Sequence, residues 1–147
     1  MICKTKNNKN NRMFKIKLPV EGFDKEKKCI YAFTIVDHEG NKFVYIGITK
    51  SSNNTGISTP LGRLGTHLKK RGNTHSILKN IQEINPKKVN FLFKFITDLE
   101  GQKEEQELIE YFRNQDGYTC LNKTKPFKNT IIINENDFVR MIKNSFN

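Results

Sequence analysis

The sequence predicts an α/β domain in which a small antiparallel sheet of three strands is flanked by helices. Three observations carry this prediction. Two aromatic stretches within 29–48 are joined by a short polar loop, and a third stretch, 89–96, alternates phenylalanine with other residues. Apolar residues recur at helical spacing between and after them, at 60–68, 75–84 and 100–112. Period-two patterns indicate strands, and periods near 3.6 indicate helices.

The first two strands form a predicted hairpin. Stretches 29–36 and 43–48 are rich in β-branched and aromatic residues, and the polar segment 37–41 between them has the length of a hairpin loop. A glycine inside a strand often marks the close approach of a ligand or another backbone. Gly47 is therefore a candidate substrate contact, and Lys50 just beyond the strand is a candidate phosphate contact.

The register of this hairpin brings two phenols together. If Val36 pairs with Lys42 across the odd-numbered loop, Tyr31 lies opposite Gly47, and odd positions pair with odd positions. Tyr31 and Tyr45 then share one face of the hairpin, within mutual reach. Two ordinary half-buried strand tyrosines would give the same pattern, because aromatic residues are common in strands.

The helix expected at 60–68 carries a basic pair. Arg63 and His67 are four residues apart, so they share a helix face. Arginine can hold a phosphate through two parallel hydrogen bonds, and histidine can donate, accept or transfer a proton near neutral pH. The alternative is a surface helix on which Arg63 and His67 have no functional role. The inward stripe of this helix is Leu61, Leu64 and Leu68. The basic residues that follow it are candidate DNA contacts: Lys69, Lys70 and Arg71.

The helix at 100–112 carries a carboxylate on its apolar side. Glu105 lies three and four residues before Leu108 and Ile109, which define the inward face together with Phe112. A lone inward carboxylate costs free energy unless a cation or hydrogen bonds compensate it. Glu105 is therefore the first candidate for a cation ligand, and Glu107 is the second.

Length and charge bound the function. The chain has 147 residues, which fits one domain, and 26 basic against 15 acidic residues give a net charge of +11. Such an excess favours a polyanionic partner, although a lysine- and asparagine-rich coding bias would also produce it. With no apolar run of membrane-spanning length and three cysteines without metal-like spacing, we expect a cytoplasmic protein with free thiols and no membrane contact.

The chain divides into three parts. Residues 1–28 form a basic N-terminal arm and connector, in which 13–20 reads as a short edge strand. Residues 29–125 form the central domain. Residues 126–147 form a C-terminal strand and helix that pack on the core. The inward residues expected on that helix are Phe138, Met141 and Ile142.

Ile30-Tyr31 followed by Tyr45-Ile46-Gly47 resembles the paired signature of the GIY-YIG nucleases. Cys29 stands where that family usually has glycine. The similarity extends over roughly residues 29–122, and four more positions follow in the family's order: Arg63, His67, Glu105 and Asn122.

The resemblance implies an endonuclease that hydrolyses phosphodiester bonds of double-stranded DNA with one divalent ion, Mg²⁺ or Mn²⁺, held by Glu105. Tyr31 or Tyr45 would polarise the attacking water with the help of a neighbouring cation. Arg63 would stabilise the charge of the transition state, and Asn122 would position the loops of the site. The resemblance does not decide between a monomer and a homodimer.

Pro60-Leu61-Gly62-Arg63-Leu64 with His67 resembles the restriction-endonuclease branch more than the intron-homing branch. A sequence-specific restriction-type enzyme is therefore the first expectation. A stand-alone nuclease of a phage or mobile element, with a homing or repair-like role, is one alternative. A non-catalytic nucleic-acid-binding module that kept the fold is another, although all six candidate positions hold chemically competent residues.

Overall fold

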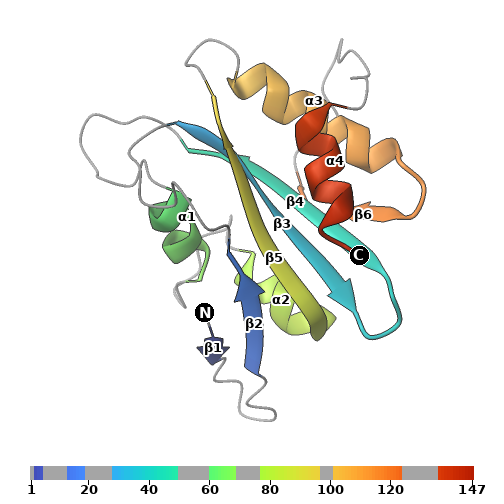
Figure 1. Cartoon of the computed structure of the whole chain (residues 1–147). Coiled ribbons are helices and arrows are strands. Elements are labelled where there is room, and N and C mark those ends of the chain that lie inside the picture. The colour runs from blue at the N-terminus through green and yellow to red at the C-terminus, as the bar shows by residue number, and fades with distance from the viewer. Residues whose placement is uncertain are drawn as a thin grey trace.

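The computed structural model describes residues 2–4, 13–18, 28–49, 60–68, 77–96, 101–123 and 136–147. Their strands are β1 (Ile2–Lys4), β2 (Met13–Lys17), β3 (Cys29–Asp37), β4 (Lys42–Ile48), β5 (Pro86–Phe95) and β6 (Tyr118–Cys120). Their helices are α1 (Pro60–His67), α2 (Leu78–Ile84), α3 (Gly101–Asn114) and α4 (Asp137–Asn144). The strands join in the order β1-β2-β5-β3-β4-β6, with β3 and β5 crossing the centre of the molecule (Figure 1).

The predicted hairpin register is confirmed. Val36 pairs with Lys42, and Tyr31 lies opposite Gly47 on the neighbouring strand. The Asp37 carboxylate closes the loop, because its Oδ1 accepts the backbone N–H of Asn41 at 2.8 Å. These contacts hold the β3 and β4 backbones in one register and so fix which residues share a face.

The expected three-stranded antiparallel sheet is only the centre of the real one. Strand β3 pairs antiparallel with both β4 and β5, as expected. Strand β2 then joins β5 in parallel, β6 joins β4 in parallel, and β1 adds an antiparallel strand beside β2. The added strands span only three to five residues, so period-two alternation is hard to detect in them. Strand β2, assigned from sequence to the arm as an edge strand, lies inside the six-stranded sheet.

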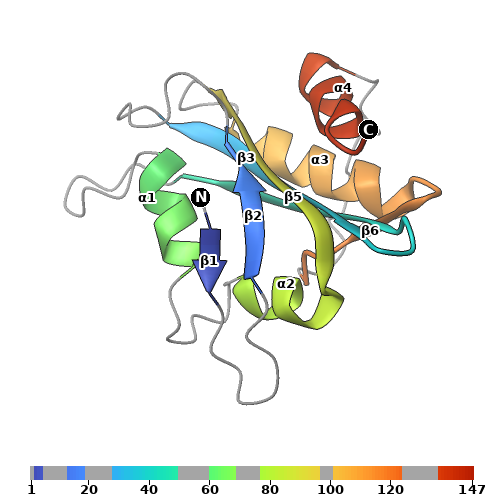
Figure 2. The same cartoon turned by 60° about the horizontal axis from the view of Figure 1, so that its bottom comes forward.

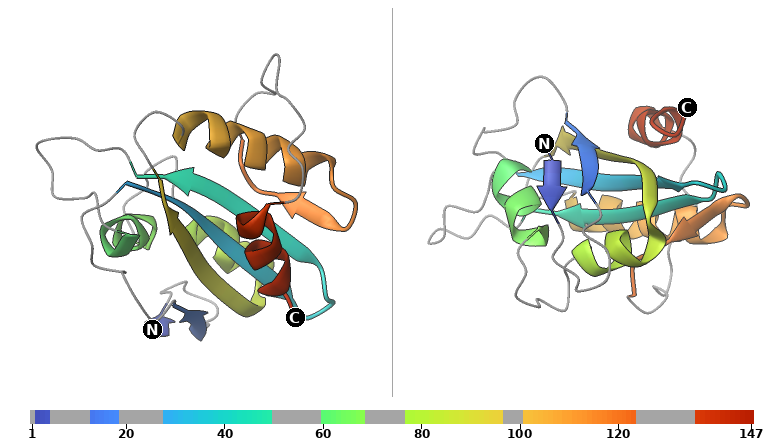
Figure 3. Two further views of the ribbon diagram at one scale, coloured as in Figure 1. Left: turned by 45° about the horizontal axis from the view of Figure 1, so that its top comes forward. Right: turned by 90° about the horizontal axis from the view of Figure 1, so that it is seen from below.

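The helices cover both faces of the sheet. Odd-numbered residues of β3 such as Tyr31 pack with α1 and α2 in one cluster, and even-numbered residues such as Ala32 pack with α3 and α4 in another. Figure 2 and the right panel of Figure 3 show α1 and α2 on the opposite side of the sheet from α4. None of the described helices is long and apolar enough to cross a membrane.

The C-terminal helix packs on the core with a different stripe from the expected one. Phe138 and Ile142 are buried as expected, but Met141 is 45% exposed and Val139 is buried in its place. The cap fixes this orientation, since the Asn136 side chain accepts the Val139 N–H at 2.9 Å. The inward stripe therefore runs through adjacent residues 138 and 139, so spacing from Phe138 alone misplaced Met141.

Candidate active site

The hydroxyl of Tyr31 is the meeting point of strand β3 and helix α1. His67 Nε2 lies 2.8 Å from Tyr31 Oη, and Arg63 Nη2 donates a hydrogen bond to the same oxygen at 3.5 Å. The Arg63 guanidinium also stands 5.9 Å from the centre of the Tyr31 ring. Arg63 and His67 reach one oxygen because they are one helical turn apart. The three side chains therefore converge on one phenol oxygen.

Tyr31 is a buried phenol. Only 1% of its surface is exposed, and its ring stacks on Phe91 with the centroids 5.6 Å apart. Burial raises the pKa of the Tyr31 hydroxyl well above its ordinary 10.0, and the Arg63 charge opposes that rise. In the folded protein Tyr31 is therefore a neutral phenol near neutral pH.

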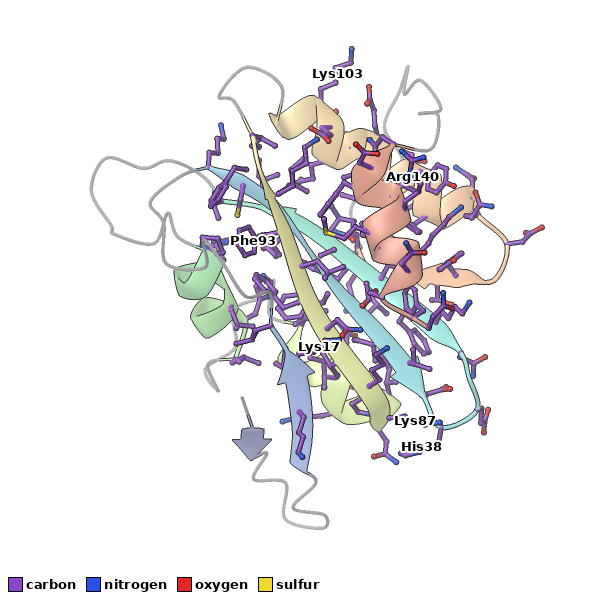
Figure 4. The ribbon with its side chains drawn as sticks, in the orientation of Figure 1. Lys17, His38, Lys87, Phe93, Lys103 and Arg140 are labelled. Atoms are coloured by element: carbon purple, nitrogen blue, oxygen red, sulfur yellow. The ribbon has the colours of Figure 1, made fainter. Side chains whose placement is uncertain are left out.

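Glycine at position 47 leaves room for this phenol. A Cβ built on Gly47 would lie 2.2 Å from Tyr31 Oη, far inside van der Waals contact. The close approach expected at this glycine is thus made by Tyr31. Figure 4 shows Phe93 of β5 on the side of the sheet where α1 lies. Phe93 is the β5 residue that pairs with Tyr31, so β5 borders the site beside Tyr31.

His67 is held from two sides. Only 2% of the residue is exposed, and its Nδ1 accepts the backbone N–H of Ile77 at 3.2 Å. Its ring lies 5.3 Å from the rings of Phe33 and Tyr45. The turn before α2 thereby fixes the imidazole that meets Tyr31. No residue pattern predicts this contact, because the donor is a backbone group.

Tyr45 is the second phenol of the site. It is half-buried, on the same face of the sheet as Tyr31, as the register predicts. Burial raises the pKa of the Tyr45 hydroxyl above its ordinary 10.0, while the Arg63 charge lowers it and the Glu105 charge raises it. Of the two phenols, Tyr45 is the more open to solvent.

The carboxylate of Glu105, the first candidate cation ligand, acts electrostatically on both phenols. Its negative charge contributes to the raised pKa of Tyr31 and of Tyr45, so the three groups share one electrostatic environment. Two neighbouring carboxylates of α3 meet lysines: Glu104 lies 3.0 Å from Lys94, and Glu107 lies 3.9 Å from Lys103.

Asn122 supports the site through the backbone of β4. Its Oδ1 accepts the Ile46 N–H at 2.9 Å, and its Nδ2 donates to the Ile46 carbonyl at 2.8 Å. Ile46 lies between Tyr45 and Gly47, so this amide holds the strand that carries both. The structure therefore gives Asn122 a positioning contact with the strand that carries Tyr45 and Gly47.

The predicted basic contacts fall outside the described residues: Lys50, Lys69, Lys70 and Arg71. Cys29, at the position where glycine was expected, is completely buried, and its N–H donates to Thr49 Oγ1 at 2.8 Å. No residue pattern singles out Thr49, whose side chain links the start of β3 to the end of β4.

One of three comparisons with known proteins finds a match for this chain. The model of the GIY-YIG catalytic domain family matches residues 27–119, which is more than half of the chain. The matched segment contains Tyr31, Tyr45, Arg63, His67 and Glu105. Neither the search of curated proteins nor the search of solved structures returned a match. The chain therefore belongs to the GIY-YIG catalytic domain family, whose domains are nucleases that act on nucleic acid.

Proposed function

We propose that this protein is a metal-dependent endonuclease that hydrolyses phosphodiester bonds of double-stranded DNA, with sequence-specific, restriction-type cleavage. The observation that carries the proposal is the convergence of Arg63 and His67 on the Tyr31 hydroxyl, with Tyr45 and Glu105 beside it. Restriction-type cleavage is supported by the resemblance of Pro60-Leu61-Gly62-Arg63-Leu64 with His67 to that branch.

An unsatisfied donor supports a phosphate ligand. Arg63 Nε is buried and has no hydrogen-bond partner within the described part of the chain. A buried donor without a partner costs about 1–3 kcal/mol, so an acceptor oxygen at this place would be stabilised. A phosphate offers such oxygens in a geometry that matches the guanidinium fork. The net charge of +11 would attract the DNA backbone from a distance.

Tyr45 is the phenol that we propose meets the attacking water. Tyr31 is fully buried and already contacts Arg63 and His67, whereas Tyr45 is half-buried. To take a proton from water, Tyr45 must first release its own phenolic proton to solvent, and the Arg63 charge favours that phenolate against the pKa rise caused by burial. Tyr31 would hold Arg63 in place, and Arg63 would then stabilise charge that develops on the phosphate.

The residues present fit one magnesium ion, or manganese in its place. A Glu105 oxygen is the ligand type that Mg²⁺ prefers, and Mg²⁺ usually keeps several waters and binds few carboxylates. Among the described residues no three His, Cys, Asp or Glu side chains gather into a metal site, so Glu105 would act with water and phosphate oxygens. A bound divalent ion would supply Lewis-acid stabilisation of the phosphate and the leaving oxygen.

The test is cleavage of plasmid DNA by the full chain with Mg²⁺, followed by sequencing of the ends. The expected result is a discrete set of ends that disappears with a chelator and with the Glu105→Gln variant. Scattered ends would contradict restriction-type cleavage and indicate a non-specific nuclease. Intact plasmid, together with salt-sensitive DNA binding, would contradict the nuclease proposal and indicate a non-catalytic nucleic-acid-binding module.

A further inference from the structure

The His67 ring contacts two polar partners of different kinds. Its Nδ1 accepts the backbone N–H of Ile77 at 3.2 Å, and its Nε2 lies 2.8 Å from Tyr31 Oη. A backbone N–H is a donor only, so the nitrogen that faces it carries no hydrogen. A neutral imidazole then has its single hydrogen on Nε2, the nitrogen that faces Tyr31.

We propose that Ile77 fixes His67 as the neutral Nε2–H tautomer, and that His67 acts as a positioning residue that donates to Tyr31. In this arrangement His67 does not remove the proton of the phenol, because its acceptor nitrogen points away toward α2. The role in cleavage rests on the proposed nuclease function, while the tautomer itself does not.

The packing around the ring fixes its orientation. A half-turn of the imidazole would place carbon atoms opposite both Ile77 and Tyr31, and both hydrogen bonds would be lost. His67 is 2% exposed, with the rings of Phe33 and Tyr45 at 5.3 Å, so water is a poor replacement for either partner. The two contacts thus specify the ring orientation as well as the tautomer.

The consequence appears at the Tyr31 oxygen. Arg63 Nη2 donates to Oη at 3.5 Å, so His67 and Arg63 both act as donors there. A phenol oxygen accepts two hydrogen bonds and donates one. With its acceptor positions directed at His67 and Arg63, the Tyr31 hydroxyl keeps its own hydrogen and presents it away from them. His67 therefore sets the direction in which Tyr31 donates.

Nitrogen-15 NMR of the full chain reads the tautomer directly, because an imidazole nitrogen without a hydrogen resonates far downfield of a protonated one. The His67 signals are identified as those lost in His67→Gln. The expected pattern at neutral pH is an unprotonated Nδ1 and a protonated Nε2. A protonated Nδ1, alone or together with Nε2, would overturn the proposal.

Tyr31→Phe separates the two partners in the same spectrum. Phe keeps the ring packing and removes the hydroxyl, while the Ile77 N–H stays in place. The expected result is that His67 keeps the Nε2–H pattern. If His67 changes to the Nδ1–H tautomer in this variant, Tyr31 selects the tautomer and the role assigned to Ile77 is wrong.

Two substitutions of His67 then separate the two contacts in cleavage. A Gln amide places an N–H near the Nε2 position and can donate to Tyr31, whereas the shorter Asn can only accept from Ile77. We expect His67→Gln to cut within about tenfold of the parent protein, and His67→Asn to lose about 10²–10³-fold in single-turnover rate, as for other lost donors. Equal losses, or a better Asn variant, would contradict the donor role. If the parent protein cuts no DNA, the nuclease proposal fails, and the NMR pattern still decides the tautomer.

Discussion

Tyr31 and Gly47 form a steric pair across the central hairpin. They lie opposite each other in the β3–β4 register, and the Tyr31 hydroxyl fills the space that a side chain at position 47 would need. The aromatic residue of the first signature tripeptide and the glycine of the second are thus two halves of one contact. Any side chain at position 47 would displace the phenol, so Tyr31 can occupy this place only because residue 47 is glycine.

We expect Gly47→Ala to destabilise the protein by about 1–3 kcal/mol, as for other overpacked cores, and to lower cleavage strongly. Its Cβ would lie 2.2 Å from Tyr31 Oη, so the phenol must leave Arg63 and His67. Denaturant unfolding and single-turnover cleavage measure the two effects. The control is Gly65→Ala, which meets nothing within 4 Å on helix α1 and should stabilise by about 0.5–1 kcal/mol. Equal behaviour of the two variants would contradict the steric account.

We expect Glu105→Gln to reduce Mg²⁺-dependent cleavage by at least about 10²-fold while DNA binding is kept or tightened. The change removes a charged oxygen ligand with little change of shape. Cleavage and gel-shift binding are measured on the same DNA. Glu107→Gln is the matched control, because that carboxylate lies beside Lys103 on the same helix. Loss of cleavage in Glu107→Gln alone would move the metal to that residue.

We expect Arg63→Lys to be nearly as damaging as Arg63→Ala, with a loss of about 10²–10³-fold in single-turnover rate. The Arg63 guanidinium reaches Tyr31 Oη with Nη2 and leaves a buried Nε for a phosphate oxygen. An ammonium cannot serve both places. Arg140→Lys, at an exposed arginine of α4, should leave the rate unchanged. An Arg63→Lys enzyme within about threefold of the parent protein would rule out the bidentate contact.

We expect Tyr45→Phe to slow cleavage by about 10²–10⁴-fold and to abolish a pH dependence that Tyr31→Phe preserves. The pKa of Tyr45 is raised above 10.0 by burial, so the phenolate fraction grows with pH throughout the range below that value. The cleavage rate of the parent protein should therefore rise from neutral pH without reaching a plateau below 10.0. A rate that is flat with pH, or unchanged in Tyr45→Phe, would show that this phenol does not activate the water.

We expect stability to fall between pH 9.0 and about 11 because of Cys29, whose pKa burial raises from 9.0 to about 11. Above pH 9.0 the unfolded thiol loses its proton while the folded one keeps it, so the unfolded state is favoured as pH rises. The slope from one such group is at most about 1.4 kcal/mol per pH unit. Denaturant unfolding of the parent protein and of Cys29→Ala across this pH range measures how the free energy of unfolding depends on this thiol. Parallel curves would mean that the Cys29 thiol is not desolvated.

The sequence predicted those parts of the fold that have strong periodicity. The hairpin register followed from an odd loop between two aromatic strands, and the inward face of α3 followed from three apolar residues at helical spacing. Strand β6 was not predicted, because three residues show no alternation. The orientation of α4 depended on its Asn136 cap and on burial of Val139, and spacing alone cannot choose between adjacent stripes.

The sequence predicted the part of the candidate site that is formed by side chains. Arg63 and His67 share a helix face as their spacing indicated, while their meeting with Tyr31 was expected only from the family resemblance. The burial that distinguishes Tyr31 from Tyr45 depends on packing against residues distant in sequence, and both phenols have the same pattern along the strands. The Ile77 contact is made by a backbone group, which no residue type reveals.

Asn122 takes the place of a peptide group beside β4. Backbone pairing of β6 with β4 ends near Val44, and the amide of Asn122 supplies the next acceptor and donor to Ile46. Deamidation of this side chain would replace the Nδ2 donor by an oxygen that faces the Ile46 carbonyl, so one attraction would become a repulsion. A slow, spontaneous change of this amide would thereby loosen the strand that carries Tyr45. We expect the storage lifetime of the folded site to depend on this side chain.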